Sequence, residues 1–362
     1  MLSATHHRVH ALAHSTSSSP SPLILRPLSS LSVPSSSYVS ASTPSCRTLP
    51  NTPSISQGQH STRRKRGVRG SAPMSRLVAA GVGGESSVQL PPDVQGPCVD
   101  LAHKLADAAA AITRQYFRAP FDVETKLDAS PVTIADKQAE TAMRELLTQH
   151  VPEHGVFGEE HGVKFGSGAG TPYMWVLDPI DGTKSFITGK PLFGTLISLL
   201  YNGTPVLGII DQPILKERWL GVAGKPSTLN GQPISTRPCQ DISKAYLYAT
   251  TPHMFEGASE AAFNRVRDAV RIPMYGCDCY AYGLLAAGHT DIVCEADLKP
   301  YDYMALVPII KGAGGCITDW AGGALSWQPN PGDTDLVSSW PNEVLATGDA
   351  RVHEVALKLL QG

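Results

Sequence analysis

Apolar residues recur every three or four positions in two stretches that open the regular part of the chain, near Pro91. The stretches are 99–118 and 133–149. Side chains at this spacing share one face of a helix, so two amphipathic helices are predicted. Thr133 is suited to begin the second helix. Asp136 lies in its first turn, where the helix dipole stabilises a carboxylate.

The next part of the chain carries short apolar runs instead. Strands are predicted over 155–157, 174–177, 195–201, 206–210 and 218–222. Asn202-Gly203 separates two of these runs and favours a tight hairpin, because both residues adopt positive φ readily. A further turn is expected at Asn230-Gly231. These signals predict a largely antiparallel meander after the two helices.

The last third of the chain alternates between the two kinds of element. Strands are predicted over 245–250, 291–295, 316–318 and 344–347, and helices over 261–270, 280–287, 301–312 and 351–360. The change of pattern places a boundary between two lobes near 235–241. The chain contains no internal repeat that would indicate a solenoid.

The first 84 residues have a composition of their own. They contain no Asp or Glu, nine basic residues and many Ser and Pro; the first acid is Glu85. This composition is typical of an organelle transit peptide. A disordered tail, or a nuclear signal at Arg63-Arg64-Lys65-Arg66, is the alternative. We expect a disordered transit peptide over 1–84, removed near 78–84 on import into the chloroplast stroma.

Removal of this leader changes the charge of the protein. The whole chain has 30 basic and 32 acidic residues, so loss of nine basic residues leaves 21 against 32, a net charge of −11. Such an acidic protein is poorly suited to nucleic acid and well suited to divalent metals and cationic substrates. No apolar run approaches the roughly 20 residues that span a bilayer, so no membrane association is expected.

The cysteines match no zinc pattern, since Cys277 and Cys279 are separated by one residue and not two. We expect the six cysteines beyond the leader to be buried or half-buried free thiols.

Acidic residues gather in the hexapeptide Asp178-Pro179-Ile180-Asp181-Gly182-Thr183. Pro179 fixes φ and donates no backbone hydrogen bond, so a turn is expected directly after the strand 174–177. Both carboxylates and the Ile180 carbonyl can then converge, and Mg²⁺ prefers such oxygen ligands. A helix that begins at 182–184 would point free N–H groups at the same place, where they can hold a phosphate.

An isolated Asp-x-x-Asp is more often an ordinary acidic turn that caps a helix. Three further acidic segments favour the metal site here: Glu159-Glu160 after a predicted strand, Asp302 at the start of a helix, and Asp136 in a first turn.

Three motifs resemble the inositol monophosphatase superfamily: Gly158-Glu159-Glu160, the hexapeptide 178–183, and Tyr301-Asp302 ahead of Gly312-Ala313-Gly314-Gly315. The resemblance runs from about Val99 to the C-terminus. It implies an α+β fold, a layered α-β-α-β-α sandwich of the kind shared with fructose-bisphosphatases. It also implies a homodimer and two or three Mg²⁺ ions per site.

The resemblance also implies roles by matching position. Glu159, Asp178, Asp181, Asp302 and the carbonyl of Ile180 resemble the metal ligands, and Glu159 counts among the catalytic residues. Thr183, with Asp136 behind it, resembles the pair that orients the attacking water. Gly182 and Thr183 are expected to bind the phosphate. Lys126 resembles a lysine near the site on a mobile loop; a solvated loop lysine is the equal alternative.

The run after the hexapeptide departs from the inositol-type pattern. Ser185–Pro191 and the segments Asp211-Gln212-Pro213 and 275–282 resemble the histidinol-phosphate phosphatases of the superfamily, and with the leader they resemble the plant enzymes. Histidinol phosphate carries an ammonium and an imidazole, which favour acidic walls. Glu295 resembles a substrate-contacting glutamate, and Asp278 is the second candidate. The alternatives are a solvent-facing strand end for Glu295 and a helix cap for Asp278.

We therefore expect a Mg²⁺-dependent phosphatase that hydrolyses L-histidinol phosphate. It would have an N-terminal α+β lobe with the metal site over 85–238 and a C-terminal α/β lobe with the substrate wall over 239–362. The alternatives are a phosphatase for inositol or another small phosphate monoester, and a non-catalytic metal-binding regulatory protein. A calcium-binding module is excluded, because its run of alternating acids is absent.

Overall fold

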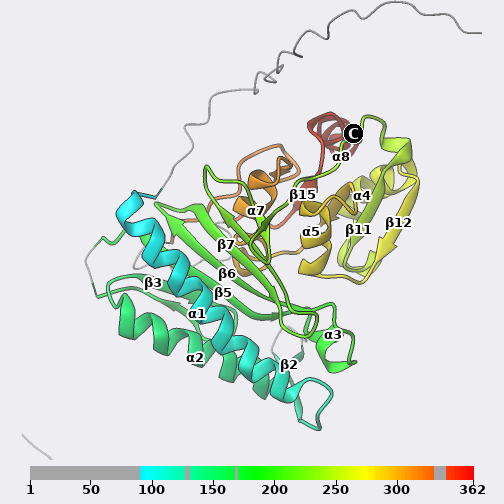
Figure 1. Ribbon diagram of the computed structural model, residues 1–362. Coiled ribbons are helices and arrows are strands. Elements are labelled where there is room, and N and C mark those ends of the chain that lie inside the picture. The colour runs from blue at the N-terminus through cyan, green and yellow to red at the C-terminus, as the bar shows by residue number, and fades with distance from the viewer. Residues whose placement is uncertain (1–89, 127–130, 168–169, 330–339) are drawn as a thin grey trace, which may run out of the picture. The chain divides into compact units, whose positions relative to one another are not determined.

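The computed structural model describes residues 90–126, 131–167, 170–329 and 340–362; the predicted transit peptide over 1–84 lies outside them. The described elements are two larger sheets, one small hairpin and the helices around them (Figure 1). The small hairpin pairs β1 (Val123–Thr125) with β2 (Pro131–Thr133).

The first large sheet has eight strands in the order β10-β9-β8-β7-β6-β5-β3-β4. Its strands are β3 (Gly155–Gly158), β4 (Gly162–Lys164), β5 (Tyr173–Asp181), β6 (Gly194–Tyr201), β7 (Thr204–Gln212), β8 (Glu217–Val222), β9 (Thr228–Leu229) and β10 (Gln232–Pro233). The meander β5-β6-β7-β8 is antiparallel, as predicted, and β3 pairs with β5 in parallel. The turn after β6 contains Asn202-Gly203, both at positive φ, which confirms the predicted hairpin.

The second sheet has five strands in the order β12-β11-β13-β15-β14. They are β11 (Tyr246–Ala249), β12 (Ile272–Tyr275), β13 (Ile292–Glu295), β14 (Cys316–Thr318) and β15 (Val344–Thr347). Strand β12 was not predicted. It is an edge strand of four residues that includes Pro273, and proline obscures the strand pattern although an edge tolerates it.

Helices form the other three layers. They are α1 (Pro92–Tyr116), α2 (Ile134–His150), α3 (Thr183–Ile187), α4 (Ala258–Ala269), α5 (Cys279–Ala286), α6 (Pro300–Tyr303), α7 (Leu306–Gly312) and α8 (Ala350–Gln361), with 3-10 turns at Ile242–Lys244 and Pro252–Met254. Figure 1 shows α1 and α2 side by side across one face of the first sheet. Helices α5, α6 and α7 share a core with its other face, whereas α4 and α8 pack on the second sheet. This arrangement confirms the predicted α-β-α-β-α sandwich.

Two predicted helices differ from the structure. Helix α1 begins at Pro92, earlier than predicted, because proline is well tolerated in a first turn. The helix predicted over 301–312 is divided into α6 and α7. Pro308 explains the break, since its ring lacks an N–H and would clash with the carbonyl of Met304 in a continuous helix.

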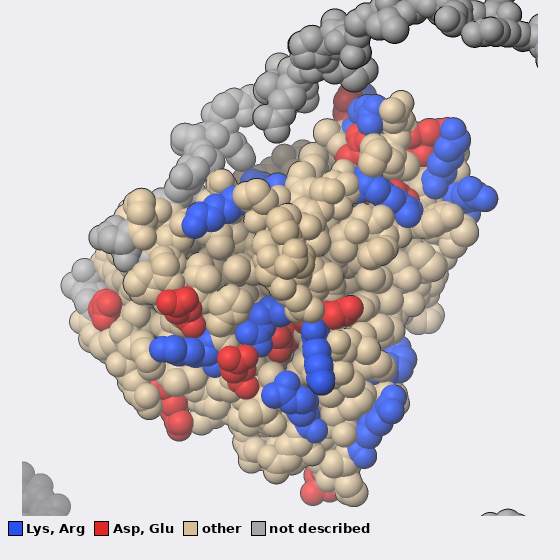
Figure 2. Space-filling model, viewed as in Figure 1, with Lys and Arg blue, Asp and Glu red and all other residues tan. Residues whose placement is uncertain are grey.

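Among the described residues, no helix combines the length and hydropathy needed to cross a membrane. The six cysteines there are free, five of them buried and Cys316 half-buried, as predicted. On the face shown in Figure 2, acidic and basic side chains are interspersed over the surface. The division into lobes at 238/239 falls between the two sheets and stays a prediction.

Candidate active site

A cavity of ≈ 230 Å³ collects most of the predicted site residues. It is lined by the acidic residues of β5, the first turn of α3, the start of α5, the end of β13 and Asp302 of α6. The lining residues are Glu159, Asp178, Ile180, Asp181, Gly182, Thr183, Lys184, Thr250, Met254, Asp278, Cys279, Tyr282, Glu295, Leu298 and Asp302. Of the predicted residues, Asp136 and Lys126 are not in this lining.

Three carboxylates form a tight cluster in this cavity. Oxygens of Asp178, Asp181 and Asp302 lie within 4.8 Å of one another, and Asp178 is buried. Burial and the neighbouring carboxylates raise the pKa of Asp178 and of Asp181 well above the ordinary value, and burial raises that of Asp302 to about 7. The raised pKa values favour protonation of these carboxyls, and a bound cation would allow all three to be ionised together. The all-oxygen donor set fits a hard divalent ion such as Mg²⁺.

The carboxylates of the hexapeptide converge, but the turn predicted at Pro179 does not form. Strand β5 continues through Pro179 to Asp181, and its register with β6 shifts between Asp178 and Asp181. One extra residue in this bulge leaves Pro179 outside the regular ladder, so its missing N–H costs little. Thr195 Oγ1 donates to the Pro179 carbonyl (2.8 Å), and the Ile180 N–H donates to Asp178 Oδ1 (3.0 Å).

Gly182 makes the sharp change from β5 to α3. Its φ is +92°, and a Cβ there would lie 3.0 Å from the carboxyl carbon of Asp278. Helix α3 begins at Thr183, as predicted. The hydroxyl of Thr183 donates to the Ile180 carbonyl (3.1 Å), so two predicted site groups are in contact.

Asp136 lies just outside the cavity, in the capping box of α2. Its Oδ2 accepts hydrogen bonds from the N–H (2.8 Å) and the hydroxyl (2.6 Å) of Thr133, while Oδ1 is buried and has no hydrogen-bond partner among the described residues. Thr183 is therefore not hydrogen-bonded to Asp136 in this structure. Burial raises the pKa of Asp136 to about 6.

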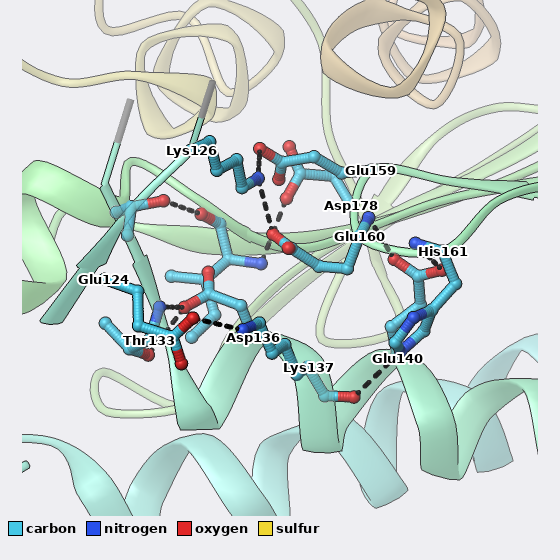
Figure 3. Close-up of polar contacts among 12 residues, drawn as sticks. Glu124, Lys126, Thr133, Asp136, Lys137, Glu140, Glu159, Glu160, His161 and Asp178 are labelled. Atoms are coloured by element: carbon cyan, nitrogen blue, oxygen red, sulfur yellow. Dashed lines mark hydrogen bonds and ion pairs between the residues drawn. The ribbon is translucent and has the colours of Figure 1, made fainter. Parts of the chain in front are cut away.

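Lys126 contacts Glu159 of the predicted site and the neighbouring Glu160. Its Nζ donates to Glu159 Oε1 (2.6 Å) and to Glu160 Oε1 (2.7 Å), as Figure 3 shows. Burial lowers the pKa of Lys126, but the two carboxylates outweigh this effect and raise it overall. The alternative of a solvated loop lysine is therefore wrong. Burial also raises the pKa of Glu160 to about 7.

Glu140 was missed by the sequence analysis. This fully buried residue of α2 accepts hydrogen bonds from the backbone N–H groups of Glu160 (2.7 Å) and His161 (3.2 Å) (Figure 3). It also accepts one from Nε of Arg144 (2.7 Å). It thus holds the turn that carries Glu159. A signal was present, because Asp136, Glu140 and Arg144 lie four residues apart on one face of α2.

Glu295 is buried at the end of β13, with 3% of its surface exposed, so the solvent-facing alternative is wrong. Its Oε1 accepts from the Thr250 N–H (2.7 Å) and its Oε2 from the Tyr282 hydroxyl (2.9 Å). Burial raises its pKa to about 7. Thr250 and Tyr282 were not among the predicted site residues.

Asp278 stands at the N-terminus of α5, but its side chain does not cap that helix. Its Oδ2 instead accepts from the hydroxyl of Ser185 (2.9 Å) in α3. Asp181 Oδ2 accepts a hydrogen bond from the N–H of Cys279 (2.5 Å) and thereby caps the N-terminus of α5. The helix-cap alternative for the Asp278 side chain is therefore wrong. Asp278 joins α3 to α5, and Asp181 joins the end of β5 to α5.

The comparisons with known proteins agree with this geometry. The family model described as Inositol monophosphatase family matches residues 95–360. The "Bifunctional phosphatase IMPL2, chloroplastic" of Arabidopsis thaliana is 54% identical over 261 residues, or 72% of this chain and 74% of that protein. A "Histidinol-phosphatase" of Chlorobaculum parvum is 34% identical over 229 residues, or 62% of this chain and 87% of that protein. The solved structure of an inositol monophosphatase from Zymomonas mobilis is 45% identical in sequence and matches with a TM-score of 0.64. The match covers 75% of this chain and 100% of the chain in that structure.

Proposed function

The chain belongs to the inositol monophosphatase family of phosphatases, and from this premise we propose that it hydrolyses L-histidinol phosphate to L-histidinol and phosphate. The observation that carries the proposal is a pair of carboxylates, Asp278 and Glu295, that line the cavity beside the acidic cluster. They give the cavity more negative charge than metal binding needs. A substrate with a cationic end would offset that charge.

Enzymes of this family generally use Mg²⁺. Asp178, Asp181 and Asp302 would hold the first ion, and Glu159 with the Ile180 carbonyl would complete a site for two or three. When bound, Mg²⁺ offsets charge on the phosphate and lowers the pKa of water. Glu159 is engaged by Lys126, whose ammonium offsets its charge at the edge of the site.

The remaining roles belong to residues of this chain. The backbone N–H groups of Gly182 and Thr183 bind phosphate oxygens at the start of α3. Thr183 and Asp136 orient the attacking water, for which the unpartnered Oδ1 of Asp136 supplies a buried acceptor. Asp278 and Glu295 bind the amino and imidazole groups. A charge-assisted hydrogen bond to either group is worth about 1.5–3 kcal/mol.

A second candidate is inositol phosphate, favoured by the 45% identity to the inositol monophosphatase of Zymomonas mobilis. Inositol offers only hydroxyls beside its phosphate. It would bring no positive charge to the buried Glu295 or to Asp278, whose cationic neighbours in the structure are Lys190 and Lys184. For this reason we rank it second.

We also propose that the mature enzyme is a homodimer in the chloroplast. The Arabidopsis relative is named chloroplastic, and the composition of 1–84 supports import.

A panel of phosphate esters tests the proposed substrate. Phosphate release should give a higher kcat/KM for histidinol phosphate than for inositol phosphate or glycerol phosphate. Glu295→Gln should lower kcat/KM for histidinol phosphate by about one to two decades and leave glycerol phosphate nearly unchanged. Glu217→Gln is the matched control, because the Glu217 carboxylate accepts a hydrogen bond from the Tyr280 hydroxyl outside the cavity. A wild-type preference for inositol phosphate would disprove the substrate but not the phosphatase activity.

A further inference from the structure

Each carboxylate oxygen of Glu295 accepts a hydrogen bond from its own donor. The backbone N–H of Thr250 contacts Oε1, and the hydroxyl of Tyr282 contacts Oε2 at 2.9 Å. Glu295 and Tyr282 are 3% and 1% exposed, and both line the cavity. Water therefore has little access to the Glu295 carboxylate, and no cationic side chain forms an ion pair with it in the part of the chain that the structure describes.

A carboxylate oxygen accepts two hydrogen bonds. Thr250 and Tyr282 each use one position, which leaves acceptor capacity on both oxygens for a ligand. Burial raises the pKa of Glu295, whereas the hydrogen bonds from Thr250 and Tyr282 lower it and so stabilise the ionised form. Without the hydroxyl of residue 282, a buried oxygen would lose its donor, and the neutral acid would gain population at pH 7.

Resting on the proposed function, we infer that Tyr282 is a positioning residue for specificity: through its hydrogen bond it holds the Glu295 carboxylate oriented to bind the cationic end of the substrate. Tyr282 does not need to touch the substrate to act. Its effect should be confined to esters that use Glu295, because the acidic cluster and α3 bind the phosphate of every ester alike.

The kinetic signature follows from the position of Glu295, which is not part of the acidic cluster. An interaction with the non-reacting end contributes equally to the ground state and the transition state. Its loss therefore raises KM and leaves kcat nearly unchanged. A purely structural role for Tyr282 would instead alter both esters and both constants.

Tyr282→Phe is the test variant, since it removes one oxygen atom and keeps the buried ring. We expect KM for histidinol phosphate to rise about tenfold, with kcat and the kinetics of glycerol phosphate nearly unchanged. Tyr280→Phe is the matched control. It stands two residues away on α5, and its hydroxyl donates to Glu217 (2.6 Å) outside the cavity. It should leave both esters unaffected.

A double-variant cycle shows whether the effect passes through Glu295. In the Glu295→Gln background, Tyr282→Phe should cause no further rise in KM, because coupled residues are non-additive. A second measurement is inhibition of glycerol phosphate hydrolysis by L-histidinol, which reports binding without the phosphate. Its inhibition constant should rise about tenfold in Tyr282→Phe.

Each other outcome overturns the inference. An equal loss for both esters, or full additivity with Glu295→Gln, would make Tyr282 structural. Unchanged kinetics of Tyr282→Phe would show that the Tyr282 hydroxyl does not position Glu295. The proposed function survives each of these outcomes. If Tyr282→Phe is too unstable to purify, Tyr282 is structural and the inference is wrong. If the wild type does not prefer histidinol phosphate, the proposed function fails and the inference fails with it.

Discussion

Asp181 serves two parts of the molecule at once. Its carboxylate belongs to the cluster with Asp178 and Asp302, and the same carboxylate accepts the N–H of Cys279 at the start of α5. The residue therefore joins the proposed metal site to the helix that carries Tyr282. A substitution that removes the charge but keeps an oxygen separates these two contributions.

Asp181→Asn should lower kcat by several orders of magnitude while the fold persists, because the amide keeps an acceptor for Cys279 but binds Mg²⁺ weakly. Phosphate release at saturating Mg²⁺ measures the loss. Added Mg²⁺ should raise the Tm of the wild type more than that of the variant, since only native-state binding stabilises. Turnover close to wild type would rule Asp181 out as a ligand.

At the scale of elements, α2 supports the metal site through two of its carboxylates. Asp136 closes the capping box at its first turn, and Glu140 binds the N–H groups of Glu160 and His161 one turn later. The preceding Gly158 has no room for a side chain, since a Cβ would lie 2.1 Å from Glu140 Oε1. Helix and turn are packed in direct contact, so the position of Glu159 depends on α2.

Glu140→Gln should weaken the apparent affinity for Mg²⁺ by about 10- to 100-fold, as loss of a supporting partner does at other metal sites. The neutral amide supports the turn less strongly and leaves Arg144 without its counter-charge. The Mg²⁺ concentration for half-maximal phosphate release measures the effect. Glu145→Gln, on an exposed position of the same helix, is the control. Equal Mg²⁺ requirements in both variants would contradict the supporting role.

At the scale of the whole molecule, stability should depend on pH through a buried histidine. His353 lies between the hydroxyls of Thr318 (3.0 Å) and Thr347 (3.1 Å), and burial lowers its pKa from 6.5 to about 4. Below pH 6.5 the unfolded chain binds a proton that the folded chain does not. Stability therefore falls as the pH decreases from 6.5 to 4, by about 3 kcal/mol in total.

Urea unfolding of wild type and His353→Gln between pH 4 and 7 checks this value. The difference between the two free energies of unfolding should shrink towards pH 4, because only the wild type has the histidine to protonate. A difference that is independent of pH would show that His353 does not titrate in this range.

The leader acts on the whole molecule by setting its compartment. A fusion of residues 1–90 to a fluorescent protein should accumulate in chloroplasts, because the segment is basic, rich in Ser and free of acids until Glu85. Fluorescence in the cytosol would refute the transit peptide. Fluorescence in mitochondria would keep the leader but change the compartment.

What the sequence determined by itself was local. The start of α3 at Thr183, the N-cap of α2 at Thr133 and the Asn202-Gly203 hairpin all depend on residues within a few positions of one another. Each could be predicted, because caps, turns and hydrophobic periods arise from near neighbours. The family resemblance extended these local signals to the layered fold.

Only the tertiary structure decided which distant groups meet. Asp278 turns away from its own helix towards Ser185, 93 positions earlier, and Glu140 binds a turn 20 positions later. The path of β5 through Pro179 required pairing with β6, which leaves the proline in a bulge. Hydrophobic periodicity tells which face of an element is buried but not which partner covers it. The contacts that hold Glu159 and Glu295 in place arise from that packing.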